Sequence, residues 1–211
     1  ACELGVIKAS ESLSEGKLAD AADALAAVAS DATDRNVALA IEIVARFLDT
    51  YEEYQIQPRY QELLKNCRLL AEYSARSMDG QISQRASILL AELRLLAGDA
   101  DIVKTEELLS RVAEAGGRSD QEISRCRARL LIAKGDWVAA AQQWGLICEL
   151  QLRESGDDTR NWAWWRAKYY QLLCWSKTAE ATKEELYRRI EVIRSSCGPV
   201  PPLWDEKLKS L

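Results

Sequence analysis

The sequence predicts an all-α protein, because amphipathic helix patterns follow one another along the 211 residues and no long stretch alternates with the period of a strand. Hydrophobic residues make up 48% of the chain, which is enough to bury a sizeable core. Very short turns separate the predicted helices, so consecutive helices should pair as hairpins. We expect one α-helical domain over residues 1–211.

The first half of the chain carries six predicted helices. In residues 35–54, apolar side chains recur at three- and four-residue steps, the period of one helix face, at Val37, Ile41, Val44, Leu48 and Tyr51. Residues 58–77 show the same period, and Pro58 stands where a first helical turn tolerates proline. With ends placed to within about 2 to 4 residues, the expected helices are 3–14, 17–31, 35–54, 58–77, 81–97 and 102–116.

The second half carries five more. Ser119 with Glu122, and Thr182 with Glu185, have the spacing of a capping box, which satisfies the free amides at a helix start. Glycines at 116–117 and at 156 suit helix ends, where a left-handed residue is favoured. The expected helices are 119–134, 136–155, 160–176, 181–195 and 203–210.

Several of the short turns share one pattern. In the clearest copy, a small residue lies seven before a glycine, and a large, a small and a large residue lie two, five and nine after it: Ala128, Gly135, Trp137, Ala140 and Trp144. A second copy has Gly16, Leu18, Ala21 and Leu25, and a weaker one has Ala91 and Gly98. The glycine permits a tight reversal, and the alanines let two helices approach closely. The pattern predicts a helical hairpin with a reusable interface.

This pattern resembles the tetratricopeptide repeat (TPR) family, whose signature joins small first-helix residues to a glycine–aspartate–aromatic turn. Residues 121–154 match best, at Ala128, Leu131, Gly135, Asp136, Trp137, Ala140, Trp144 and Ile147. The hairpins recur at about 40 residues rather than the standard ~34, and the usual closing proline is missing, so the repeats are degenerate. The resemblance implies a right-handed α-solenoid of about five antiparallel helix pairs, with "GPVPPLWDEKLKSL" as a C-terminal capping helix.

The residue types present disfavour catalysis. The chain has no histidine, the commonest general base, and neither a C-x-x-C pair nor a glycine-rich phosphate loop. Acidic pairs such as Glu52-Glu53, Asp157-Asp158 and Glu184-Glu185 are expected at helix ends or on exposed faces. The six scattered cysteines are expected as small buried thiols. We therefore expect no enzyme, no cofactor and no metal site.

Charge and hydropathy narrow the class of partner. The 28 basic and 33 acidic residues give a net charge of -5, too small and too evenly spread to predict a nucleic-acid or membrane-surface partner. No apolar run approaches the ~20 residues that span a bilayer, so we expect a soluble chain with no transmembrane segment. Its methionine-free start at Ala1-Cys2 favours a processed product or a piece of a longer protein. The sequence does not distinguish a cytoplasmic from an exported protein.

Binding is the leading expectation: a non-catalytic protein–protein interaction scaffold holding a peptide or protein segment in its concave groove. Two alternatives stay open. One is a structural or oligomerisation segment of a larger protein, with a homo-oligomer as its product. The other is an enzyme with an unrecognised carboxylate site.

The family resemblance also implies which residues line that groove. The positions that the family turns toward its groove are Glu122, Arg125 and Arg129 in the 121–154 repeat, Arg166 and Tyr170 in the following helix, and Arg85 and Glu92 in the preceding one. Arginines facing one groove favour an acidic peptide or a C-terminal carboxylate, because a guanidinium holds a carboxylate with two hydrogen bonds. The alternative is that these arginines pair with neighbouring glutamates on a solvated face.

The stretch "RNWAWWRAKYYQLLCW" divides into faces when it is placed on a helix. The expected core stripe is Trp162, Trp165, Tyr169, Leu172 and Leu173. A second, mixed face that would meet another helix or a ligand carries Trp164, Lys168, Gln171 and Trp175. Exposure of Trp164 and Trp175 would indicate a protein contact.

Overall fold

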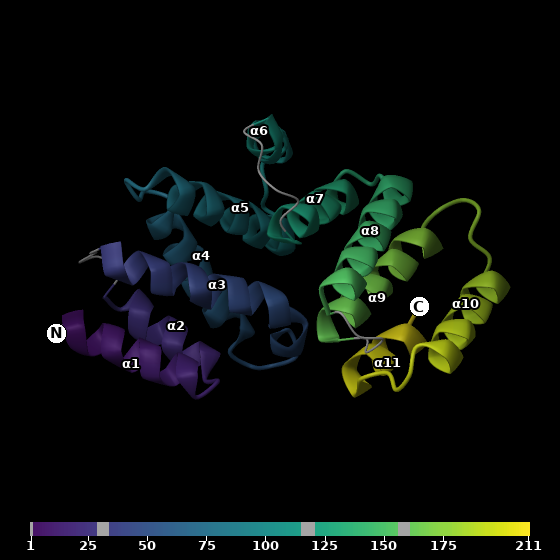
Figure 1. The fold of residues 1–211 in the computed structure, drawn as a ribbon, viewed down its shortest axis with the longest axis horizontal. Helices are drawn as coiled ribbons and strands as arrows, with labels where there is room; N and C mark the ends of the chain where they lie inside the picture. Colours follow the sequence, from purple (N-terminus) through teal and green to yellow (C-terminus); the bar gives the residue numbers. More distant parts are fainter. Residues whose placement is uncertain (1, 29–33, 115–120, 156–160) are drawn as a thin grey trace. The chain divides into compact units, whose positions relative to one another are not determined.

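The computed structural model describes residues 2–28, 34–114, 121–155 and 161–211. Within these ranges the regular elements are eleven α-helices and no strand, which confirms the all-α prediction (Figure 1). The chain divides into two compact units, residues 1–116 (unit 1) and 117–211 (unit 2), and each is described by itself. Among the described residues, no helix is both long and apolar enough to cross a membrane.

Unit 1 is a set of helices packed against their neighbours along the chain. α1 pairs with α2, α3 pairs with α4, and α5 packs on both α3 and α4, whereas α6 touches α5 sparingly. The unit's core contains fully buried aromatic and aliphatic side chains, among them Leu25, Ile43, Phe47, Leu63, Leu70 and Leu89. The helices are α1 Cys2–Ser14, α2 Leu18–Ala26, α3 Asp34–Tyr54, α4 Tyr60–Ser74, α5 Gly80–Ala97 and α6 Ile102–Glu114.

Unit 2 is built around its third helix. The helices are α7 Gln121–Ala133, α8 Trp137–Ser155, α9 Trp162–Ser176, α10 Lys183–Ser196 and α11 Pro202–Lys209. α7 packs on α8 and α8 packs on α9, while α10 touches α9 at few positions. α11 lies on α9: the ring of Trp204 is 5.1 Å from that of Trp162 and 5.7 Å from that of Tyr169. Trp204 and Leu208 are buried in the core of unit 2, so α11 packs through its apolar side chains.

Three of the hairpin turns share one backbone geometry. Gly16, Gly98 and Gly135 all have φ near +75°. The amide of the next residue donates to the carbonyl five residues earlier, which is the bond that closes a helix with a left-handed residue: Lys17 to Ser12 at 2.8 Å, Asp99 to Arg94 at 3.1 Å and Asp136 to Leu131 at 3.0 Å. Apart from the adjoining residues, no heavy atom of the described part of the chain lies within 4 Å of a Cβ built on these glycines, so backbone conformation and not space requires them. The predicted glycine turns are therefore confirmed.

The helix starts agree with the sequence in part. The Thr182 hydroxyl accepts a hydrogen bond from the Glu185 amide at 3.2 Å, as predicted. Pro58, by contrast, lies in the turn before α4, because successive short turns close there through the Gln57 and Tyr60 amides. The predicted signals at Ser119, 116–117 and 156 lie outside the described residues.

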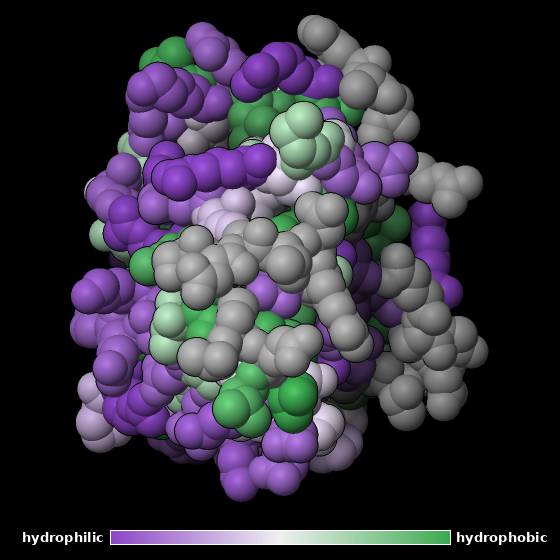
Figure 2. Space-filling view, turned by 90° about the vertical axis from the view of Figure 1, so that its left-hand side faces the viewer, coloured by the Kyte–Doolittle hydropathy of each residue, from purple (hydrophilic) through white to green (hydrophobic). Residues whose placement is uncertain are grey.

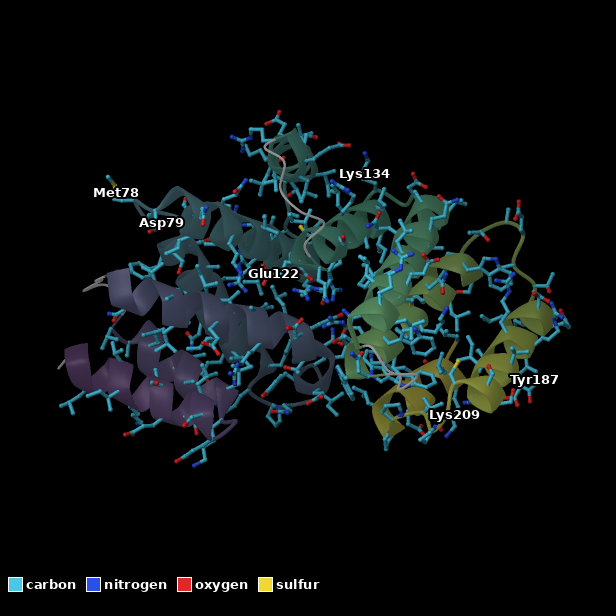
Figure 3. All side chains as sticks on the ribbon, viewed as in Figure 1. Met78, Asp79, Glu122, Lys134, Tyr187 and Lys209 are labelled. Atoms are coloured by element: carbon cyan, nitrogen blue, oxygen red, sulfur yellow. The ribbon has the colours of Figure 1, made fainter. Side chains whose placement is uncertain are left out.

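The surface is largely hydrophilic where Figure 2 draws it, and hydrophobic side chains form small separate areas there. Large exposed apolar side chains of unit 1 are correspondingly scattered: Leu4 and Ile7 on α1, Ile56 after α3, and Met78 before α5 (Figure 3). Two other exposed side chains of unit 1, Leu69 and Val103, line separate clefts of about 330 and 520 Å³ that also carry charged residues. The candidate site lies in unit 2, where a cleft of about 610 Å³ also contains a tryptophan.

Candidate binding site

The aromatic helix α9 is buried on more than one side. Trp165 and Leu172 of the predicted core stripe are buried, while Trp162, Tyr169 and Leu173 are half-buried. Trp164, from the mixed face, is buried as well, with its ring 4.9 Å from that of Trp165 in an edge-on arrangement. Both α8 and α11 pack on α9. Of Trp164 and Trp175, whose exposure would indicate a protein contact, Trp175 is partly exposed and Trp164 is not.

The residues predicted to line a groove differ in their environments. In unit 1, Arg85 is exposed and Glu92 is buried, both on α5. In unit 2, Glu122 is half-buried, whereas the side chains of Arg125, Arg129 and Arg166 are between 3% and 5% exposed. The assignment of these residues to a partner stays a prediction.

Two of the predicted residues meet inside unit 2. The rings of Trp144 on α8 and Tyr170 on α9 stack with centroids 4.8 Å apart and an interplanar angle of 20°. The Arg129 guanidinium from α7 lies 5.2 Å from the Tyr170 ring and 5.8 Å from the Trp144 ring. A cation over aromatic faces is attracted by the ring quadrupole, so Arg129 contributes to the packing of three helices.

A cleft of about 610 Å³ opens between α8, α9 and α10 of unit 2. It lies where α8 packs closely on α9 while α10 touches α9 at few positions. Its lining includes apolar side chains, three cations and one carboxylate: Ala141, Gln142, Lys168, Gln171, Leu172, Trp175, Glu185, Arg188, Arg189, Val192 and Ile193. We call this the α8–α10 cleft.

The α9 wall of the cleft is held by a close approach to α8. A Cβ at Gly145 would lie 2.7 Å from the Gln171 amide nitrogen, so glycine makes room for that side chain. Lys168 donates a hydrogen bond to the Gln171 side-chain oxygen at 2.6 Å, and its ammonium lies 5.4 Å from the Trp164 ring. These contacts place a positive charge beside the apolar floor at Leu172.

The α10 wall carries a network of charges. Arg188 donates two hydrogen bonds to Glu185, at 2.8 and 3.0 Å, and Arg189 donates one at 2.9 Å. Hydrogen bonds from Arg188 and then Arg189 lower the pKa of the Glu185 carboxyl to about 2. The Arg189 guanidinium also lies 4.2 Å from the Trp175 ring, which connects α10 to α9 across the cleft.

Other contacts hold α10 to its unit. Leu186 and Ile190 are buried in the core of unit 2, and Arg194 pairs with Asp205 of α11 at 2.8 Å. Tyr187 is exposed on α10 (Figure 3). The helix is therefore anchored by one face while Val192, on another, stays 57% exposed in the cleft.

The cleft can bind a ligand through apolar contacts and charged side chains. Its carboxylate is already bonded by two guanidinium groups and stays ionised at neutral pH. Elsewhere, burial raises the pKa of the thiols of Cys67, Cys148 and Cys174, which reduces their nucleophilicity because the thiolate is the reactive form. The cleft is thus suited to hold a ligand with apolar and acidic groups.

Part of this site was predictable from the sequence. Lys168, Gln171 and Trp175 were placed together on a face expected to meet a helix or a ligand, and all three line the cleft. The α10 residues were missed, because residues 181–195 read as an ordinary amphipathic helix. The adjacent basic residues Arg188 and Arg189, followed by Val192 and Ile193, were the available signal.

Comparison with known proteins adds no relative. No family model matches the chain, and neither a curated protein nor a solved structure matches it.

Proposed function

We propose that this chain is a non-catalytic interaction scaffold of TPR-like helical hairpins and that a segment of a partner protein binds in the α8–α10 cleft. One observation carries the proposal: the cleft joins an apolar floor and a half-buried tryptophan to a basic rim. Binding sites commonly combine a mostly apolar concave surface with a few charged groups. Tryptophan and arginine are also the residue types that contribute most at protein interfaces.

The cleft is preferred to the predicted groove arginines as a first target for experiments. Arg125, Arg129 and Arg166 are buried, so replacing them disturbs packing as well as charge. The exposed Val192 can be changed with little effect on the core.

A display selection tests the proposal. Peptides are selected from a random library on the immobilised full chain, and their Kd is measured by fluorescence anisotropy against wild type and Val192→Ser. Because burying a valine side chain contributes roughly 1.5 kcal/mol, we expect Val192→Ser to weaken binding about tenfold.

The matched control is Val103→Ser, the same chemical change at a 64% exposed valine that lines a separate cleft on α6 of unit 1. It should leave Kd unchanged. Equal affinities for wild type and Val192→Ser would remove the cleft from the proposal. Self-association that accounts for all binding would instead favour the oligomerisation alternative.

A further inference from the structure

One ridge of α8 borders the α8–α10 cleft. Val138, Gln142 and Leu146 follow at four-residue steps, so they lie on one face of the helix. Gln142 lines the cleft, and Val138 and Leu146 on either side of it are exposed. The α8 side of the cleft therefore has a polar side chain flanked by two exposed aliphatic ones.

The α10 side repeats this helical spacing. Arg188 and Val192 are four residues apart, as are Arg189 and Ile193, and all four line the cleft. Each ridge of α10 thus passes from a basic side chain to an apolar one. Two helices that present residues at this spacing form a groove into which the side-chain ridges of a third helix can pack.

Backbone hydrogen bonding favours a helical occupant over an extended one. The cleft lining comes from three helices, whose backbone amides and carbonyls are bonded within each helix apart from the ends. An extended segment would bury its own backbone polar groups with few partners, which costs free energy. A helix satisfies those groups internally and offers only side chains.

The charge of the cleft selects acidic residues on that helix. Lys168, Arg188 and Arg189 face a single carboxylate, Glu185, which is already bonded by both arginines. Unit 2 as a whole is also basic, with 16 Lys and Arg against 13 Asp and Glu, whereas unit 1 has 12 against 20. The expectation of an evenly spread charge along the chain is therefore wrong, and the positive part of the charge is concentrated on the unit that contains the cleft.

We infer that the α8–α10 cleft takes an amphipathic, acidic helix of a partner protein, an assignment that rests on the proposed function. Apolar residues of that helix, one turn apart, pack on the α8 ridge, Trp175 and Val192. Glu or Asp residues flanking its apolar face pair with Lys168 and Arg188 at the rim.

Designed peptides test this inference directly. The probe is a fluorescein-labelled peptide of about four helical turns, apolar on one face and flanked by Glu. Matched versions carry Gln or Lys in place of Glu, and a fourth carries a central Pro that breaks the helix. Kd is measured by anisotropy on the full chain at low and moderate salt.

We expect the Glu peptide to bind about tenfold more tightly than the Gln peptide, with a gap that shrinks as salt rises. The Lys and Pro peptides should bind more weakly still. Arg188→Glu should make the Lys peptide bind more tightly than the Glu peptide. The matched control, Arg76→Glu at an exposed arginine of unit 1, should leave the order of affinities unchanged.

The outcomes separate the two proposals. If library-selected peptides depend on Val192 but the Glu peptide binds no better than its Gln or Pro version, the acidic helix is wrong and the scaffold stands. If Val192→Ser and Arg188→Glu leave every peptide unaffected, both proposals fall. A dimer of the chain that Val192→Ser dissociates would make a second copy the occupant and overturn the inference.

Discussion

The buried ring of Trp144 offers the sharpest test of the hairpin packing. Its side chain is fully buried between α7, which supplies Arg129, and α9, which supplies Tyr170. Truncating a buried Trp to Ala costs about 3 to 5 kcal/mol, since it removes apolar burial and leaves a cavity. Because the change also removes the aromatic stack with Tyr170, we expect a loss of stability in the upper part of that range.

Trp144→Phe separates packing from polar burial. Among the described residues, the buried indole nitrogen of Trp144 has no hydrogen-bond partner. Phenylalanine removes this N–H, whose burial without a partner costs about 1 to 3 kcal/mol, and keeps a ring against Tyr170. The relief offsets part of the lost volume, so we expect Trp144→Phe to lie within about 1 kcal/mol of wild type.

Urea unfolding followed by circular dichroism gives the free energy of unfolding of each variant. Leu146→Ala on the same helix is the control, because Leu146 is exposed and the change should stay within about 0.5 kcal/mol. A loss below about 1 kcal/mol in Trp144→Ala would refute the packing argument. Equal losses for the Ala and Phe variants would refute the argument from the buried N–H.

Three further predictions concern the turns, a charge and the thiols. Gly135→Ala should lower the free energy of unfolding by about 1 to 2 kcal/mol in urea titrations, because alanine disfavours positive φ; no loss would contradict the left-handed turn. The Glu185 carboxyl should titrate with a pKa near 2 by NMR. The stability that its ionised form contributes is therefore complete above the ordinary pKa of 4.5 and is lost as pH falls through 2. A titration midpoint near 4.5 would contradict the hydrogen bonds from the two arginines. Burial raises the pKa of Cys148 to about 11 and that of Cys174 to about 12. Iodoacetamide at neutral pH should therefore modify both thiols only after the protein is unfolded, as followed by mass spectrometry. Modification of the native protein at the same rate as the unfolded protein would refute their burial.

Much of the local structure was predictable. The hairpin glycines at 16, 98 and 135 were recognisable because a left-handed residue between two helix patterns is almost obligatorily glycine. Thr182 was recognisable as a cap because its hydroxyl acts on an amide three residues away. At Pro58 the predicted helix start precedes the observed start at Tyr60, within the stated margin of about 2 to 4 residues.

The environment of α9 was not predictable in the same way. Its aromatic residues occur on several faces, so periodicity selected one stripe, whereas in the packed unit Trp164 of the mixed face is buried as well. The burial of Arg129 likewise depends on a stack formed by residues of two other helices. The residue pattern of one helix does not specify which neighbouring helices pack against it.

The sequence by itself determined that the chain is helical, where its tight turns lie and which small residues its hairpins bury. These properties depend on φ preferences, capping and a 3.6-residue period, all of which act within a few residues. Only the tertiary structure decided that α10 touches α9 at few positions and that a cleft with Trp175, Val192 and Arg188 remains there. The angle between two helices follows from how their side-chain ridges meet across distant segments, and that fit is a property of the packed protein.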